Sequence, residues 1–251
     1  MMQFTFNRQL AVLYENTKNR SGQLYDSIIL NDLPEPVQRY FKLVLKHGQP
    51  YISSVRLEHN GIFKTDLKKG YINIAGEQHF SVRQPQFIWK GTTTMFTAID
   101  SYIANTGSLK VFLLNIFKVA ENKGVTSDEG ELQRWVAESV WFPTNLLPSE
   151  MVKWTAIDAN SAKLSFRYKE ILFHFTVSFN AVGDIITMQT QRFMTDEKRE
   201  TWLCKMSGYK EVNGFRIPFS AEVLWRLSSG DCSYAKFEIQ KIEYNKHYYG
   251  K

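Results

Sequence analysis

The chain has 251 residues, a formal net charge of +6 and 14% aromatic residues. A chain of this length can bury a large apolar core without disulfides or metals, and this composition excludes an intrinsically disordered protein. The basic residues are scattered, and the densest pairs, Lys68-Lys69 and Lys198-Arg199, stand beside acidic residues. A specific nucleic-acid site needs a basic stripe or patch, so we expect no specific nucleic-acid partner.

The sequence shows no targeting or membrane segment. The apolar stretch Leu10–Leu13 near the N-terminus is shorter than the roughly 7–15 apolar residues of a signal peptide, and no window approaches the ~18 of a membrane span. The two cysteines, Cys204 and Cys232, have no CxxC spacing and no neighbouring histidine cluster. We therefore expect a soluble, cytoplasmic chain without a transmembrane segment, metal or cofactor.

Two helices are predicted in residues 1–48. In the first, Phe6, Leu10, Leu13 and Tyr14 share one face at helical spacing. The second begins near Pro34, where a missing N–H costs nothing, and its apolar side chains recur at positions 37, 40, 41, 44 and 45.

Beyond residue 50 the apolar period changes to two, which predicts strands in 51–120 and again in 152–245. The stretch 109–117 is apolar on both faces and predicts either a covered strand or a short helix. A third helix is predicted over 128–142, within an inserted segment 128–148. Prolines at 143 and 148 stop this helix and bound a short turn. Asn213-Gly214 predicts a tight hairpin turn.

These elements predict a mainly β (α+β) chain. We expect one large, curved antiparallel sheet or half-barrel of about ten or eleven strands. An open sheet of this size must curl, so the N-terminal helices and the inserted helix should cover its concave face. No repeat or linker is visible, which favours a single domain over 1–251.

Several blocks of the sequence are shared with a known family. They are Leu33–Tyr40 (LPEPVQRY), Asp100–Tyr102 (DSY), Glu131–Glu138 (ELQRWVAE), Trp141–Thr144 (WFPT), Arg216–Pro218 (RIP) and Trp225. The chain resembles, from about Leu33 onward, a bacterial family of uncharacterised proteins known only as a domain of unknown function. The sequence departs from that pattern at 104–107, where the family has a glycine-rich stretch.

The strand–helix–strand order also resembles the half-barrel of LolA/LolB-like lipoprotein carriers. That resemblance implies an apolar sheet face beneath a helical lid, able to hold acyl chains. The expected lack of a signal peptide argues against a role in lipoprotein sorting itself.

Asp100 is the first candidate site residue, because it shares its predicted strand face with Phe96, Ala98 and Tyr102. A carboxylate on an apolar face must be hydrogen-bonded, paired or protonated. It is either the polar anchor of a ligand cavity or a structural acid held by backbone N–H groups or a lysine.

Glu138 is the second candidate. It stands four residues after Arg134 and three before Trp141 on the same predicted helix. It forms either a surface ion pair with Arg134 or, with Trp141, the mouth between helix and sheet.

We predict a non-catalytic module that binds a hydrophobic or lipid-like ligand. The predicted ligand-binding residues are Asp100, Tyr102, Trp135, Glu138, Trp141, Phe166, Tyr168, Phe173, Phe175, Trp202 and Trp225. One alternative is a hydrolase that uses Asp100 and Glu138 as acid and base. Another is a structural or protein-interaction domain whose own side chains fill the sheet face. A packed half-barrel and a hollow one share the same pattern of apolar and polar residues, so the sequence leaves this alternative open.

Overall fold

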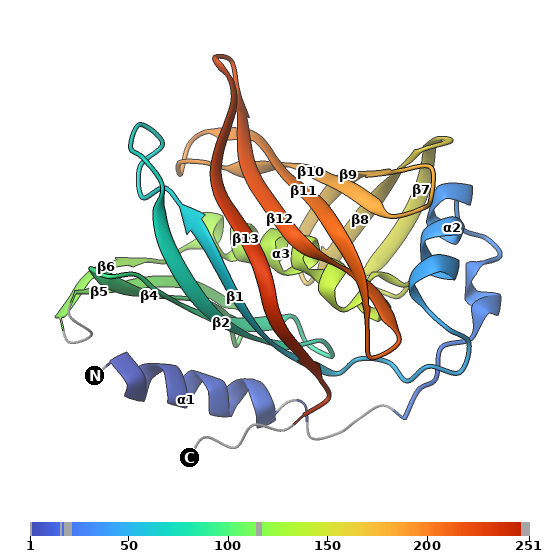
Figure 1. Ribbon diagram of the computed structural model, residues 1–251, viewed down its shortest axis with the longest axis horizontal. Helices are drawn as coiled ribbons and strands as arrows, with labels where there is room; N and C mark the ends of the chain where they lie inside the picture. Colours follow the sequence, from blue (N-terminus) through green and yellow to red (C-terminus); the bar gives the residue numbers. More distant parts are fainter. Residues whose placement is uncertain (1, 16, 18–21, 114–116, 247–251) are drawn as a thin grey trace. The chain divides into compact units, whose positions relative to one another are not determined.

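The computed structural model describes residues 2–15, 17, 22–113 and 117–246. Its strands form one antiparallel sheet in the order β6-β5-β4-β3-β2-β1-β13-β12-β11-β10-β9-β8-β7 (Figure 1). The predicted mainly β chain with a single antiparallel sheet is confirmed.

The helical elements are α1 (Met2–Glu15), η1 (Ser27–Leu30), α2 (Glu35–Val44), α3 (Val125–Glu138), η2 (Ser139–Trp141) and η3 (Pro143–Leu146). The strands before α3 are β1 (Ser54–Phe63), β2 (Ile72–Ser81), β3 (Gln86–Thr92), β4 (Phe96–Ile103), β5 (Thr106–Leu113) and β6 (Phe117–Asn122). The strands after α3 are β7 (Val152–Asp158), β8 (Ser161–Tyr168), β9 (Ile171–Phe179), β10 (Ile185–Phe193), β11 (Arg199–Val212), β12 (Phe215–Leu227) and β13 (Gly230–Tyr244).

The sheet has thirteen strands where ten or eleven were expected. The two that the pattern did not reveal, β6 and β7, are the edge strands. All six residues of β6 are exposed, and β7 buries only Val152 and Trp154. An edge strand with so few buried positions lacks the alternation by which strands are read from sequence. Of the predicted stretch 109–117, residues 114–116 lie outside the described residues, and the remainder is strand.

The helices form where they were expected, with small shifts at the third. α1 buries Phe6, Leu10, Leu13 and Tyr14 together with Met2. The third helix begins three residues early, at Val125, and continues as the two 3-10 turns η2 and η3 instead of running to 142. The predicted hairpin turn is also present, because Asn213 and Gly214 have positive φ angles of 52° and 80° between β11 and β12.

The chain divides into two compact units. Among the described residues, the first unit comprises those in 1–21, 52–135 and 237–251, and the second comprises those in 22–51 and 136–236. α3 and β13 contribute residues to both. A single domain over 1–251 stays a prediction.

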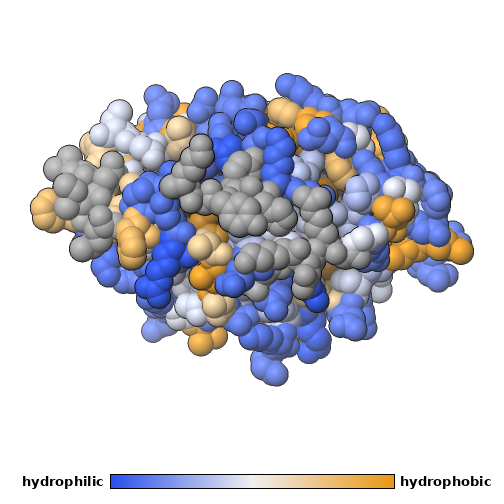
Figure 2. All heavy atoms as spheres, turned by 90° about the horizontal axis from the view of Figure 1, so that it is seen from below, coloured by the Kyte–Doolittle hydropathy of each residue, from blue (hydrophilic) through white to orange (hydrophobic). Residues whose placement is uncertain are grey.

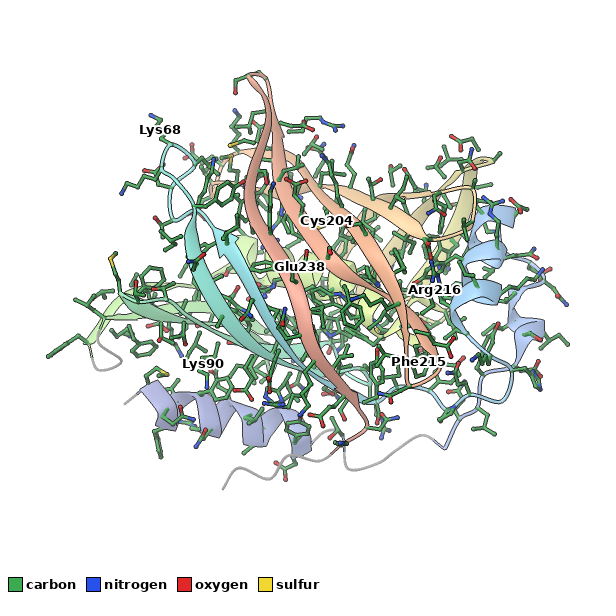
Figure 3. The ribbon with its side chains drawn as sticks, viewed as in Figure 1. Lys68, Lys90, Cys204, Phe215, Arg216 and Glu238 are labelled. Atoms are coloured by element: carbon green, nitrogen blue, oxygen red, sulfur yellow. The ribbon has the colours of Figure 1, made fainter. Side chains whose placement is uncertain are left out.

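In the first unit, α1 packs on one face of the sheet (Figure 1). Its apolar side contacts Ile88, Ile99 and Phe112, which share that face. The Tyr14 hydroxyl lies 2.8 Å from Nδ1 of the buried His79. Lys90 also extends toward α1, with its Nζ 4.5 Å from the centroid of the Phe6 ring (Figure 3).

α3 packs on the other face of the first unit. Arg134 binds Asp100, and the Trp135 indole N–H donates to the Ser81 carbonyl over 3.3 Å. At the helix start, the Gly107 N–H donates to the Asp128 carboxylate over 2.6 Å. The helices were expected on one face, and α1 differs because both faces of β3 and β4 carry apolar side chains. A strand with two apolar faces does not specify which helix covers which face.

The second unit packs its helical elements on one face of its strands. Tyr40 and Phe41 of α2 contact Phe179 and Trp154. The Trp154 indole N–H donates to the Leu146 carbonyl of η3 over 2.8 Å. Ring contacts therefore fix α2 to the sheet, and the Trp154 hydrogen bond fixes η3 to it.

No helix among the described residues is long and apolar enough to cross a membrane. Figure 2 shows the face seen from below, where the side chains are mainly hydrophilic and the apolar ones form small separate groups.

Candidate functional site

The candidate site of the first unit is centred on Asp100 of β4. Asp100 is only 8% exposed, and its Oδ2 lies 2.6 Å from Nη1 of Arg134 on α3. Its second oxygen, Oδ1, is buried and has no hydrogen-bond partner among the described groups. A buried acceptor without a partner is costly, which makes this carboxylate oxygen a candidate for a ligand contact.

Trp89 is the cross-strand neighbour of this carboxylate and is hydrogen-bonded to His59. The strand register places Trp89 of β3 opposite Asp100, and the Trp89 indole N–H donates to Nε2 of His59 over 2.8 Å. The two rings are parallel within 1°. Because the indole N–H donates to Nε2, the proton of the neutral imidazole is on Nδ1.

Two glycines make room for these rings. A Cβ atom at Gly76 would overlap the His59 imidazole, and one at Gly91 would overlap the Trp89 indole. Gly76, Gly91 and Ala98 face one another on β2, β3 and β4, next to His59. This row of small residues lets both rings lie along the sheet.

The electrostatics of the cluster are balanced. Burial, and to a smaller extent the Arg134 charge, lowers the pKa of His59 to about 4, so the imidazole is neutral at pH 7. The Arg134 guanidinium lies over the Phe87 and Trp89 rings, 4.9 and 5.3 Å from their centroids. Asp100 and Arg134 together carry no net charge. Two buried polar atoms of this cluster have no hydrogen-bond partner among the described groups, the acceptor Oδ1 of Asp100 and Nδ1 of His59.

Two further predicted site residues lie in the first unit. Tyr102 shares the face of Asp100 and is fully buried, opposite Phe87. Trp135 is fully buried too and ties α3 to the end of β2 through Ser81. Tyr102 therefore belongs to the apolar surroundings of Asp100, and Trp135 has a structural contact.

The aromatic residues predicted in the second unit do come together on one sheet face. Phe166 pairs with Phe173 across β8 and β9, and their rings stack 5.2 Å apart. Phe175 alternates with Phe173 on β9. The register carries the same face through Met188 and Thr190 of β10 to Trp202 and then Trp225.

Exposure separates these residues. Phe166, Phe173, Phe175 and Trp202 are buried, and Tyr168 and Trp225 are half-buried. Trp202 donates to the Tyr234 hydroxyl over 2.8 Å, and Tyr234 stacks on Trp225. Among these predicted residues, Tyr168 and Trp225 are therefore the ones that keep exposed surface.

Glu138 and Trp141 also lie in the second unit. Glu138 is half-buried at the end of α3, and the Trp141 indole N–H donates to the Pro218 carbonyl over 3.1 Å. Asp100 belongs to the other unit. An acid/base pair of Asp100 and Glu138 therefore stays a prediction.

Sequence reasoning missed His59 and Trp89 and treated Arg134 only as a partner of Glu138. The available signal was Gly76 and Gly91, each in a period-two segment. A glycine inside a strand pattern indicates a close approach of another group. The sequence does not say which side chains make that approach.

Fold and site together define a class: mainly β proteins with one antiparallel sheet and a buried polar cluster on an apolar face. Within that class, the chain belongs to the family of unknown function DUF6544, whose model matches residues 25–237. The family expected from the sequence blocks is thereby confirmed. No curated protein matches the chain.

Two solved structures are similar to the chain at low scores. One is a LolA superfamily protein from Nitrosomonas europaea, with 7% identity, a TM-score of 0.47, and coverage of 84% of this chain and 93% of that chain. The other is a domain from Vibrio parahaemolyticus, provisionally assigned as an outer membrane lipoprotein-sorting protein, with 7% identity, a TM-score of 0.43, and coverage of 77% and 86%. At these scores the likeness carries no inference.

Proposed function

We propose that this protein is a non-catalytic binding module for an amphiphilic, lipid-like ligand, with the ligand's polar end at Asp100. The observation that supports the proposal is the buried Oδ1 of Asp100, which has no partner among the described groups. Ligand sites typically combine an apolar lining with a few fixed polar groups, and Asp100 is such a group.

The surroundings of Asp100 favour an apolar ligand body. Phe87, Trp89 and Tyr102 share its face and are buried or nearly so. Arg134 holds the carboxylate in place through Oδ2. A fixed acceptor among aromatic rings orients the polar end of a ligand, while the rings contribute apolar contact area.

We favour binding over hydrolysis by Asp100 and Glu138. Asp100 is held by a guanidinium through one oxygen, which orients the other oxygen as an acceptor. Acid/base work on a glycosidic bond needs two carboxyl groups roughly 5–10 Å apart across a cleft. Asp100 and Glu138 belong to different units, so neither unit by itself contains the carboxyl pair that the hydrolase hypothesis needs.

The first test is ligand binding by the purified chain. Long-chain monoacylglycerols, fatty acids and lysolipids should be added while tryptophan fluorescence and melting temperature are measured. At least one amphiphile should quench the fluorescence and raise the melting temperature by several degrees. A ligand present at a hundred times its Kd stabilises the fold by about 2.7 kcal/mol.

Variants locate the site. Asp100→Asn should reduce the ligand-induced shift, measured from the variant's own melting temperature. The matched control is Asp184→Asn, which removes another buried aspartate that is paired with an arginine, Arg216. Lys163→Ala, on an exposed position of β8, is the surface control. If no amphiphile shifts the melting temperature, the structural-domain alternative replaces the proposal.

The predicted contacts of the second unit need a separate variant. Trp225→Ala changes a half-buried ring at little cost to the core. A reduced ligand effect in this variant would support the aromatic face of the second unit as a ligand surface, and an unchanged effect would remove it from the site.

A further inference from the structure

We infer that the polar end of the ligand is an uncharged hydrogen-bond donor, such as a hydroxyl or amide group, and not a free carboxylate or phosphate. The inference rests on the proposed function, because it describes the chemistry that the Asp100 site selects. It follows from which groups of the site already have partners.

Asp100 offers an acceptor and nothing else. Oδ2 is occupied by Arg134, and Oδ1 is the atom without a partner among the described groups. A carboxylate oxygen can accept but not donate a hydrogen bond. An anionic end group that reached Oδ1 would place two negative charges at hydrogen-bond distance in a poorly hydrated position, where repulsion is strong.

No positive charge in the cluster is left to offset that repulsion. The Arg134 charge is balanced by Asp100, and its guanidinium is stacked over Phe87 and Trp89. His59 is neutral at pH 7 because burial lowers its pKa to about 4. The Trp89 N–H is donated to Nε2 of His59. Nδ1 of His59 has no partner among the described groups, but as the N–H of a neutral imidazole it supplies no positive charge.

A cationic end group is disfavoured by the same pair. Nη1 of Arg134 lies 2.6 Å from Oδ2 of the same carboxylate, so an ammonium at Oδ1 would stand only a few ångströms from a guanidinium. An uncharged donor satisfies Oδ1 without this cost. Burial of a neutral group also carries a smaller desolvation penalty than burial of an ion.

The test compares ligands that differ only in the end group. Four ligands of one chain length are titrated into the wild-type chain: a 1-monoacylglycerol, a fatty acid, an alkyl phosphate and an alkylamine. The titrations are carried out at pH 8, where the carboxyl group of the fatty acid is ionised. Tryptophan quenching gives each Kd. The monoacylglycerol should bind about tenfold more tightly than the three charged ligands, the factor expected for one hydrogen bond to a charged acceptor.

Asp100→Asn should reverse the selectivity. The substitution removes the negative charge and leaves the Arg134 charge unbalanced, so the fatty acid should gain affinity relative to the monoacylglycerol. Asp184→Asn should keep the wild-type preference. If Asp100→Asn does not fold, the wild-type comparison still decides.

The outcomes separate the two proposals. Equal affinity for the fatty acid and the monoacylglycerol, or tighter binding of any charged ligand, would overturn this inference and leave the binding module standing. Lack of binding by all four would overturn both.

Discussion

Two buried aspartates of this protein are paired with arginine, and the pairs differ in how many carboxylate oxygens the arginine binds. Asp184 gives both carboxylate oxygens to Arg216, at 2.8 and 2.9 Å (Arg216 is labelled in Figure 3). Asp100 gives one oxygen to Arg134 and keeps the other without a partner among the described groups. The bidentate pair is complete as a structural contact. The incomplete pair is the one that a ligand could complete.

His59 supports a prediction of pH dependence at the residue scale. Its pKa is lowered to about 4 in the fold, against an ordinary value of 6.5, chiefly because of burial. The unfolded chain therefore binds more protons than the folded chain between these values. Its contribution to stability is full above pH 6.5 and declines as the pH falls toward 4.

We expect wild-type protein to lose on the order of 2 kcal/mol of unfolding free energy between pH 7 and 4 through this residue. In His59→Gln the loss should be smaller by that amount, as urea denaturation at a series of pH values would measure. His174→Gln, at an exposed position of β9, is the control. Parallel pH profiles for His59→Gln and wild type would contradict the assignment.

Among the elements of the first unit, α3 is held to the strands at both its start and its end. Its first turn lies directly over β5, since a Cβ atom at Gly107 would stand 2.9 Å from the Ser127 carbonyl oxygen. The Gly107 N–H also donates a hydrogen bond to the Asp128 carboxylate. Farther along, Arg134 and Trp135 bind β4 and β2. These contacts fix Arg134 against Asp100 and so define the geometry of the candidate site.

Gly107→Ala should therefore push α3 away from the sheet and cost about 1–3 kcal/mol, the usual penalty for overpacking. Gly70→Ala is the matched control, because a Cβ atom there meets nothing within 4 Å. Chemical denaturation gives the two free energies. If the two variants are equally stable, the tight contact of α3 with β5 is contradicted.

For the whole molecule, the division into two units raises the question of how they unfold. α3 and β13 each contribute residues to both units. A strand cannot lose half of its length without exposing the backbone groups of the other half, so the units should unfold together. Calorimetry should show one transition with equal van't Hoff and calorimetric enthalpies. Two resolved transitions would show that the single domain predicted over 1–251 is wrong.

Local sequence patterns were sufficient to predict the class of fold, the two N-terminal helices, the inserted helix and the family. Each of these depends on local patterns: the apolar period of α2, the alternation along β8 and β9, and the contiguous blocks around Trp135 and Trp141. The sequence also identified Asp100, because an acid on an apolar strand face violates the pattern around it.

The partner of Asp100 became visible in the tertiary structure. Arg134 reaches Asp100 across 34 residues, and Trp89 reaches His59 across 30. The edge positions of β6 and β7 and the face that α1 covers were likewise set by packing between distant segments. Periodicity reports which side of an element is apolar, whereas the pairing of elements depends on long-range contacts whose free energy no local window contains.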